Sequence, residues 1–189
     1  MKKLSDFTNR IVSSSASLVA LVALGTSLYE ARLNREQQRA TVWPYLTQGN
    51  TDLGGHYSRL VANDGMGPAL VRSFQVRARA HGAPGDTVQR AWRPAKRWID
   101  VFRALGVDGG QVMTSTMGHG RVLRAGESVT ILSLSDSARS AAFHARVNDM
   151  ETIVCYCSLY GECWSDSSEE DEPRPVDACA EEPALEFER

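Results

Sequence analysis

"HYSRLVANDGMGPALVRSFQVRARA", residues 56–80, is the stretch that decides the fold class of this 189-residue chain. β-Branched, aromatic and aliphatic residues stand on both sides of a glycine-rich centre. After the centre, the positions 70, 72, 74 and 76 would point to one side of a strand. Three of them are apolar, Leu70, Phe74 and Val76, and one is Arg72, so the alternation is partial. Short runs of this kind, bounded by turn residues, are typical of strands. The stretch therefore predicts two strands with a turn between them.

The turn spans Asn63 to Pro68. Asparagine tolerates turn conformations, glycine allows a positive φ, and proline fixes its own φ at the start of a strand. The alternative is a glycine-rich loop that binds an anion, but this segment lacks the Lys and Ser/Thr that end a P-loop. The four residues predicted to form a structural turn are Asn63, Gly65, Gly67 and Pro68.

The period-two pattern continues along the chain. Further strands are predicted near residues 111–117, 127–135 and 151–161, and "VDGG" and "RAGES" are turn signals between them. The sequence lacks the strand–helix–strand rhythm that builds parallel sheets. The predicted fold class is mainly β, an antiparallel sandwich over residues 44–164 with one or two helical insertions.

Residues 87–106, "TVQRAWRPAKRWIDVFRALG", interrupt this pattern and predict a helix. Proline suits the first turn of a helix and glycine its end, which places the helix between Pro94 and Gly106. The residues at helical spacing on its apolar side are Ala95, Trp98, Ile99, Phe102 and Leu105. A second short helix is predicted at residues 137–147.

The predicted first helix also carries the best candidate in the sequence for a binding surface. Its members are Arg90, Trp92, Arg93, Lys96, Arg97 and Arg103. Arginine interleaved with tryptophan suits anionic lipid head groups or an acidic protein partner. Nucleic acid is not predicted as a partner, because the chain is near neutral, with 21 Lys and Arg against 23 Asp and Glu. The alternative is an amphipathic helix packed on the sheet with solvated arginines.

An Asn-x-Gly-x-Gly-Pro-Ala pattern runs from Asn63 to Ala69. Together with "LRAGESVTI" (residues 123–131) and "YCSLYGECW" (residues 156–164), it resembles uncharacterised bacterial proteins that have one N-terminal membrane helix and a small β-sandwich. More loosely, it resembles Ig-like domains of the cell-adhesion-related, CARDB-like type. The resemblance implies an Ig-like sandwich and a membrane anchor, and it brings no known activity.

Residues 11–29, "IVSSSASLVALVALGTSLY", carry no charge and follow a short basic segment, residues 1–10. A helix of these 19 residues is roughly 28 Å long, close to the thickness of a hydrocarbon core. Strong helix formers then extend it as a stalk over residues 30–43, until Pro44. An uncleaved single-pass anchor is favoured over a cleaved signal peptide and over a buried helix of a soluble protein.

Basic residues flank this span on both sides, so the positive-inside comparison is nearly a tie. A short basic N-terminus before a first span usually stays in the cytoplasm. The C-terminal domain is therefore predicted to face the periplasm or the cell exterior from a bacterial inner membrane. Small residues at Ser13 and Ser17, or at Ala16 and Ala20, would let two spans approach each other and form a homodimer.

Four cysteines stand near the end of the chain: Cys155, Cys157, Cys163 and Cys179. A hairpin around Tyr160 and Gly161 could bring Cys163 opposite Cys157, and Cys179 could then close onto Cys155, but four cysteines allow three connectivities and the sequence leaves the choice open. Disulfides are favoured for an even number of cysteines outside the cytoplasm. Free core thiols and a thiolate metal site are the alternatives, although the spacing lacks the paired Cys-x₂₋₄-Cys knuckles of structural zinc sites. No metal or cofactor is predicted.

Residues 165–189 hold ten acidic residues and two basic ones, with few large apolar side chains. This composition predicts a largely disordered tail. Two alternatives stay open: the tail docks onto a partner, or it folds back onto the basic segment at low salt.

The sequence contains no Gly-x-Ser-x-Gly elbow, no His-Glu-x-x-His motif and no nucleotide-binding glycine pattern after a strand, so no enzyme is predicted. The predicted function is a membrane-anchored β-sandwich that binds or scaffolds. The alternative is a cytoplasm-facing, thiol-based metal-binding or redox module, in which accessible thiolates would be the working groups. A hydrolase with a dispersed site is a third hypothesis.

Overall fold

The three-dimensional structure is a computed structural model that describes residues 2–80, 91–180 and 182–188, with the side chains of the first helix described from Ala16 onward. It contains two compact units, residues 1–41 and residues 42–189. The first unit is a helix. The second unit holds all the strands of the described chain.

Helix α1 (Lys2–Ala40) forms the first unit. The part of this helix whose side chains the structure describes, Ala16–Ala40, is long and apolar enough to cross a membrane, and its leucines and valines are exposed. The helix ends earlier than the predicted end of the stalk. The reason lies in Trp43, whose carbonyl accepts hydrogen bonds from the N–H groups of Met66 (2.9 Å) and Gly67 (3.2 Å). Those bonds tie the residues after the helix into the β-domain.

The first sheet has four antiparallel strands in the order β1-β2-β7-β5. They are β1 (Leu46–Leu53), β2 (His56–Asn63), β7 (Ser128–Leu134) and β5 (Met113–Thr114). The β1–β2 hairpin turns at Gly54 and Gly55, whose φ values of 61° and 83° lie in the left-handed region that glycine adopts at no steric cost. The strand predicted at the start of the deciding stretch is confirmed as β2.

The second sheet has the order β10-β9-β8-β3-β4, with β6 also paired to β3. Its strands are β3 (Ala69–Ala78), β4 (Arg93–Ala95), β6 (Val122–Leu123), β8 (Met150–Cys157), β9 (Cys163–Ser167) and β10 (Arg174–Val176). A bulge between Val71 and Ser73 shifts the buried side of β3. Val71 and Phe74 are therefore buried, whereas Leu70 and Arg72, which the alternation grouped with Phe74, are not.

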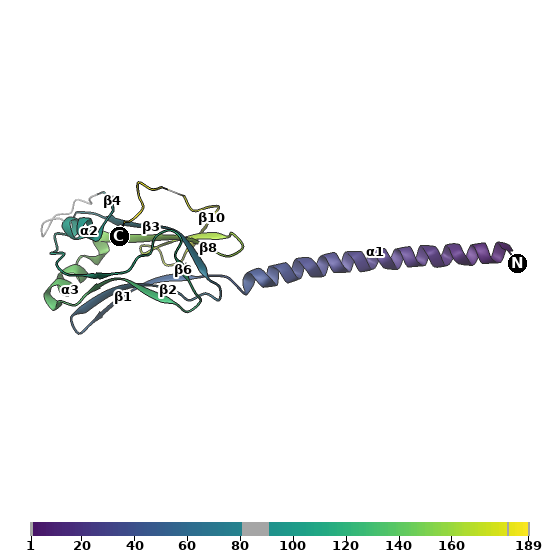
Figure 1. Ribbon diagram of the computed structural model, residues 1–189, viewed down its shortest axis with the longest axis horizontal. Helices are drawn as coiled ribbons and strands as arrows, with labels where there is room; N and C mark the ends of the chain where they lie inside the picture. Colours follow the sequence, from purple (N-terminus) through teal and green to yellow (C-terminus); the bar gives the residue numbers. More distant parts are fainter. Residues whose placement is uncertain (1, 81–90, 181, 189) are drawn as a thin grey trace. The chain divides into compact units, whose positions relative to one another are not determined.

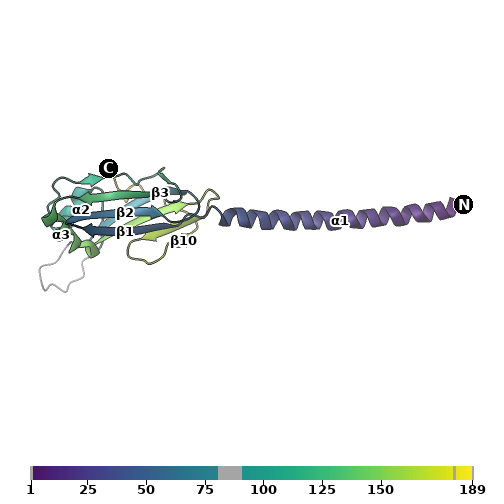
Figure 2. The same ribbon diagram turned by 90° about the horizontal axis from the view of Figure 1, so that it is seen from below.

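The two sheets lie in two layers with one hydrophobic core between them (Figures 1 and 2). Tyr57 and Leu132 of the first sheet and Val154 and Tyr156 of the second are fully buried. The Tyr156 hydroxyl accepts a hydrogen bond from the N–H of Leu46 (3.2 Å), which links the layers. The mainly β class with antiparallel sheets is confirmed, and the Ig-like arrangement of the strands stays a prediction.

Helix α2 (Trp98–Leu105) is shorter than the helix predicted within residues 87–106. The placement of Pro94 in the first turn is wrong, because this proline lies in the edge strand β4, where a missing N–H is tolerated. The predicted end at Gly106 is confirmed by its left-handed φ of 64°. Ile99, which was predicted on the apolar side, is 49% exposed. The buried side consists of Trp98, Val101, Phe102 and Leu105.

Helix α3 (Ser137–His144) confirms the second predicted helix, and a short 3-10 helix (Val147–Asp149) follows it. The carboxylate of Asp136 accepts a hydrogen bond from the N–H of Arg139 (2.9 Å) and so caps the first turn of α3. Helices α2 and α3 meet in the core, where Phe102 and Phe143 have ring centroids 5.5 Å apart.

The acidic C-terminal segment was predicted to be disordered from residue 165, but its described residues are folded. Strand β9 continues to Ser167, and β10 pairs with β9. Further on, the Phe187 ring packs against Phe74 and Trp98, at centroid distances of 5.6 and 5.1 Å. A few apolar and cysteine residues attach the segment to the sheet, which average composition does not reveal. The domain boundary expected at residue 164 is therefore wrong.

Candidate functional site

Asn63 is the centre of the predicted turn, and its side chain is fully buried. Its Nδ2 donates hydrogen bonds to the carbonyls of Gly67 (2.8 Å) and Leu123 (3.1 Å). Its Oδ1 accepts hydrogen bonds from the N–H groups of Tyr45 (3.2 Å) and Gly65 (3.1 Å). One amide thus satisfies four backbone groups from three segments, which is the geometry of a structural element.

The two glycines of this turn are needed for a different reason from the one predicted. Neither Gly65 nor Gly67 has a positive φ. A Cβ on Gly65 would overlap the backbone of Tyr45, and a Cβ on Gly67 would overlap the carbonyl group of Val42. Close approach to the segment before β1 therefore explains both glycines, and Pro68 follows them at the start of β3.

The four cysteines lie at disulfide distance in two pairs. Cys155 bonds to Cys179 and Cys157 to Cys163, with Cα–Cα distances of 5.7 and 4.0 Å. This is the pairing that the predicted hairpin favours, and Gly161 adopts a φ of 81° at the turn. The two bridges are neighbours, since the Sγ atoms of Cys157 and Cys179 are 3.9 Å apart. In a reduced chain, three thiolates within 4.8 Å of one another would be available to a metal ion.

The predicted basic surface is not one helical face. Arg90 lies outside the described residues. The others are distributed over four consecutive segments: Trp92 precedes β4, Arg93 lies in β4, Lys96 and Arg97 lie in the turn before α2, and Arg103 lies on α2. A single helix that carries all of them is therefore a wrong prediction, because α2 begins only at Trp98.

Trp92 and Lys96 of the predicted surface have partners outside that surface. The guanidinium of Arg79 lies 4.9 Å from the centroid of the Trp92 ring, a cation–π contact. The ammonium of Lys96 lies 3.7 Å from the carboxylate of Glu188. Arg79 and Lys96 are thus both engaged with neighbouring side chains, and neither is a free anion-binding group.

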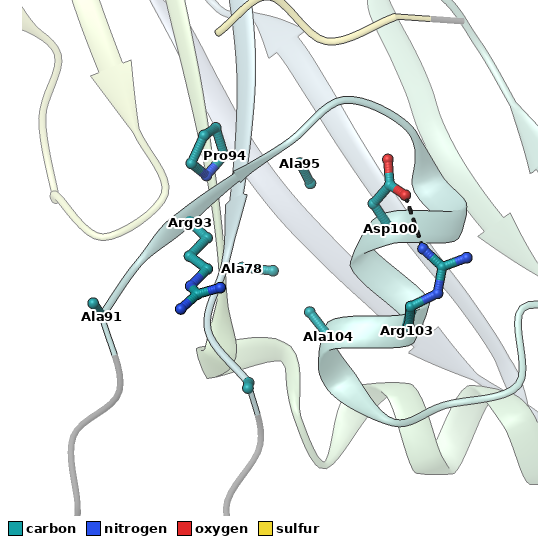
Figure 3. Close-up of a pocket in the computed structure, with 9 residues that line it drawn as sticks. Ala78, Ala91, Arg93, Pro94, Ala95, Asp100, Arg103 and Ala104 are labelled. Atoms are coloured by element: carbon teal, nitrogen blue, oxygen red, sulfur yellow. Dashed lines mark hydrogen bonds and ion pairs between the residues drawn. The ribbon is translucent and has the colours of Figure 1, made fainter.

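Arg93 and Arg103 both line a cavity of about 600 Å³ between β4 and α2. Its lining consists of Ala78, Ala80, Ala91, Arg93, Pro94, Ala95, Asp100, Arg103 and Ala104. Figure 3 shows Arg93 on one side of the opening and the Asp100–Arg103 pair on the other, with alanines between them. Arg103 lies 3.2 Å from Asp100, whereas Arg93 forms no ion pair with any residue that the structure describes. The cavity combines an apolar floor with a cation, Arg93, that has no ion-pair partner among residues 2–80, 91–180 and 182–188.

A buried polar network between the sheets was not predicted from the sequence. Arg59 is 3% exposed, and its Nε and Nη2 donate hydrogen bonds to Oγ1 of Thr152 (3.2 and 2.7 Å). Its Nη1 donates to Oδ1 of Asn50 (3.0 Å). Thr152 also bonds to Gln48, whose Nε2 donates to Oδ2 of Asp166 (2.8 Å). The network joins β1 and β2 to β8 and β9.

Asp166 of β9 closes this network, and it is 5% exposed. Burial raises the pKa of its carboxyl to about 6, although the hydrogen bond from Gln48 and the charge of Arg59 both lower that pKa. A second cavity of about 190 Å³ lies beside it, between β1 and the chain after β9. The network satisfies its own groups, so its role is structural.

No protein-family model matches this chain, and searches of curated proteins and of solved structures find no match. The resemblance to CARDB-like domains and to the uncharacterised bacterial membrane proteins therefore stays a prediction.

Proposed function

We propose that this chain is a membrane-anchored binding protein, in which α1 is the anchor and the β-domain binds an acidic segment of a partner protein. One observation carries the proposal, the cavity of about 600 Å³ with Arg93 and Arg103 at its sides. The proposal assigns no catalytic step to the chain.

The charges around the cavity favour an anionic ligand. Arg97 and Arg103 both approach the single carboxylate of Asp100, at 3.9 and 3.2 Å, so one positive charge of this trio is not compensated. Arg93 adds a second. A cation at the side of a partly enclosed cavity attracts an anion more strongly than one in open water, because the local dielectric is lower. The five alanines of the lining suit the small apolar side chains that would flank a glutamate or aspartate in a peptide.

The proposed location is a bacterial inner membrane, with an Ig-like domain on the periplasmic or outer side. The length and apolar composition of Ala16–Ala40 support the anchor. The two disulfides support an oxidising compartment, since such bonds persist mainly outside the cytoplasm. The resemblance noted from the sequence supports the bacterial assignment.

A second candidate function rests on the sulfur cluster. The Sγ atoms of Cys157, Cys163 and Cys179 lie within 4.8 Å of one another, so a chain kept reduced in the cytoplasm would present three thiolates to a soft metal ion. A membrane-impermeant maleimide distinguishes the two candidates. Labelling of intact cells only after reduction supports the anchored binding domain. Labelling that requires lysis but no reduction supports the thiol module.

Binding of a fluorescent decapeptide of alternating glutamate and alanine to the full-length chain in detergent micelles tests the acidic-partner proposal. Arg93→Glu is expected to weaken binding about tenfold, because a reversed charge at close range costs more than 1 kcal/mol. Added salt should weaken the wild-type interaction as well.

Arg124→Glu is the charge-matched control, because Arg124 is an exposed arginine in the turn before β7. Equal losses in the two variants would mean that only net charge matters and would remove the cavity from the proposal. Displacement of the peptide by anionic lipid added to the micelles would reassign the ligand to a lipid head group.

A further inference from the structure

One edge of β3 is covered incompletely by neighbouring strands. Strand β8 pairs with β3 along nearly its whole length on the other edge. On this edge, β6 pairs only with Ala69 and Leu70, and β4 only with the last three residues, Val76 to Ala78. Phe74 lies in the gap between β6 and β4. Its backbone N–H and C=O would be unpaired there unless another part of the chain reached them.

The C-terminal segment fills this gap. The N–H of Phe187 donates a hydrogen bond to the carbonyl of Phe74 (2.9 Å), and the N–H of Phe74 donates to Oε1 of Glu186 (3.1 Å). The N–H of Glu188 donates to the carbonyl of Lys96 (2.6 Å). Both backbone groups of Phe74 are satisfied as they would be by a paired strand, with a side-chain carboxylate replacing one backbone carbonyl.

The side chains of the segment fit the same place. The Phe187 ring meets Phe74 and Trp98 edge to face, with interplanar angles of 77° and 67°. A cavity of only about 40 Å³ remains beside it, and its lining also includes residues 114–117. The Glu188 carboxylate lies 3.7 Å from the ammonium of Lys96. The gap in the edge of β3 at Phe74 is thus a slot that accepts an acidic residue, then an aromatic ring, then a second acidic residue.

We infer that this slot is a peptide-recognition site for an extended acidic–aromatic–acidic segment of a partner protein, and that the chain's own Glu186–Glu188 occupies it as an intramolecular competitor. Strand addition at an open sheet edge is a general mode of peptide binding, in which backbone bonds give affinity and side-chain pockets give specificity. Charge complementarity with Lys96 and the aromatic pocket define the partner's chemistry. This slot shares no lining residue with the cavity of the proposed function.

The disulfide between Cys155 and Cys179 explains why the chain itself fills the slot. Cys155 lies opposite Ser73 in the β3–β8 register, next to the slot, and its disulfide holds Cys179 there. The segment from Cys179 to Glu186 is short, so its effective concentration at the slot is on the order of millimolar. A partner peptide at micromolar concentration therefore competes poorly until the cis segment is weakened.

The test is fluorescence anisotropy of a labelled hexapeptide, Ala-Leu-Glu-Phe-Glu-Arg, with the full-length chain in detergent micelles. Phe187→Ala empties the slot and is expected to bind the peptide at least about tenfold more tightly than wild type. Tyr160→Ala is the matched control, because Tyr160 is a 44%-exposed aromatic residue in the β8–β9 turn. It is expected to bind the peptide no better than wild type does.

Two further measurements keep the inference testable. Lys96→Glu combined with Phe187→Ala should weaken peptide binding about tenfold, and a peptide with alanine in place of phenylalanine should not bind. If Phe187→Ala reduces folding, Glu188→Lys replaces it, because the Glu188 side chain is 61% exposed and its replacement removes the ion pair with Lys96, which weakens the hold of the chain's own segment without removing a core ring.

Equal peptide binding by wild type and the opened variants, or equal binding of a scrambled peptide, would overturn the inference. A concentration-dependent dimer of the wild type that Phe187→Ala abolishes would also overturn it, by making a second copy the occupant. Loss of acidic-decapeptide binding in Arg93→Glu concerns the other site, so failures of the two proposals are distinguishable.

Discussion

Replacing Asp166 by asparagine should stabilise the domain at neutral pH and leave it almost unchanged at pH 4. The Asp166 carboxyl is 5% exposed, and burial raises its pKa from 3.8 to about 6. Between these two pH values the folded protein holds a proton that the unfolded chain has released. The free energy of unfolding must therefore fall as pH rises through this window.

The magnitude follows from the two pKa values. The interval between 3.8 and about 6 corresponds to about 3 kcal/mol, which is the upper limit of the gain from Asp166→Asn at pH 7. Asparagine keeps an oxygen that can accept the Gln48 hydrogen bond. The opposing effect is the loss of a negative charge near the buried guanidinium of Arg59. That attraction already lowers the pKa of Asp166, and burial outweighs it.

Urea denaturation of wild type and Asp166→Asn at pH 4, 5, 6 and 7, followed by near-ultraviolet circular dichroism, measures the difference directly. Other carboxyls cancel in that difference. Asp171→Asn is the control, because Asp171 is an exposed carboxylate that lines the cavity of about 190 Å³ beside Asp166. The reasoning is refuted if the difference between wild type and Asp166→Asn is independent of pH, or if the variant is the less stable protein at pH 7. The second result would mean that Arg59 needs Asp166 as its counter-ion.

Three other substitutions probe the structural elements. Asn63→Ala should lower the free energy of unfolding by about 3 kcal/mol, because four backbone groups lose their buried partner, and thermal denaturation would show it. Gly67→Ala should cost more than about 1 kcal/mol through overlap with the segment before β1, whereas Gly49→Ala, whose Cβ would have its nearest neighbour at 3.6 Å, should cost less in the same assay. Cys155→Ser with Cys179→Ser should cost about 3 kcal/mol in urea denaturation, as expected for a cross-link over a sequence separation of 24 residues. An unchanged midpoint for any of these variants would contradict its assigned role.

Local patterns predicted the parts of the fold that depend on local physics. The strands around the turn at Asn63 follow from alternation and turn residues, and the helix end at Gly106 follows from the freedom of glycine to adopt a positive φ. Cys157 and Cys163 lie opposite each other because the turn between β8 and β9 is short, and that spacing can be read directly from the sequence. In each case the deciding interaction lies within a few residues.

The errors arose where a distant segment decides. Proline is at home both in the first turn of a helix and in an edge strand, and Pro94 lies in a strand only because β3 offers its edge. The acidic tail has a composition typical of disorder, yet β9, Cys179 and Phe187 attach it to the sheet. For the candidate cavity, the sequence identified Arg93 and Arg103 as residues of interest. It could not show that they come from different elements with alanines between them.

Arg59 shows how a pattern can indicate a site without naming its members. In β2 the buried positions alternate through Tyr57, Arg59 and Val61, so the same period that predicts the strand also places a guanidinium in the core. A charge at such a position requires hydrogen-bond partners, since burial without them costs several kcal/mol. The partners, Asn50 and Thr152, come from one adjacent strand and from the opposite sheet. A charged residue in phase with a buried alternation therefore predicts a polar network between the sheets, and only the packing of the sheets supplies the other half of it.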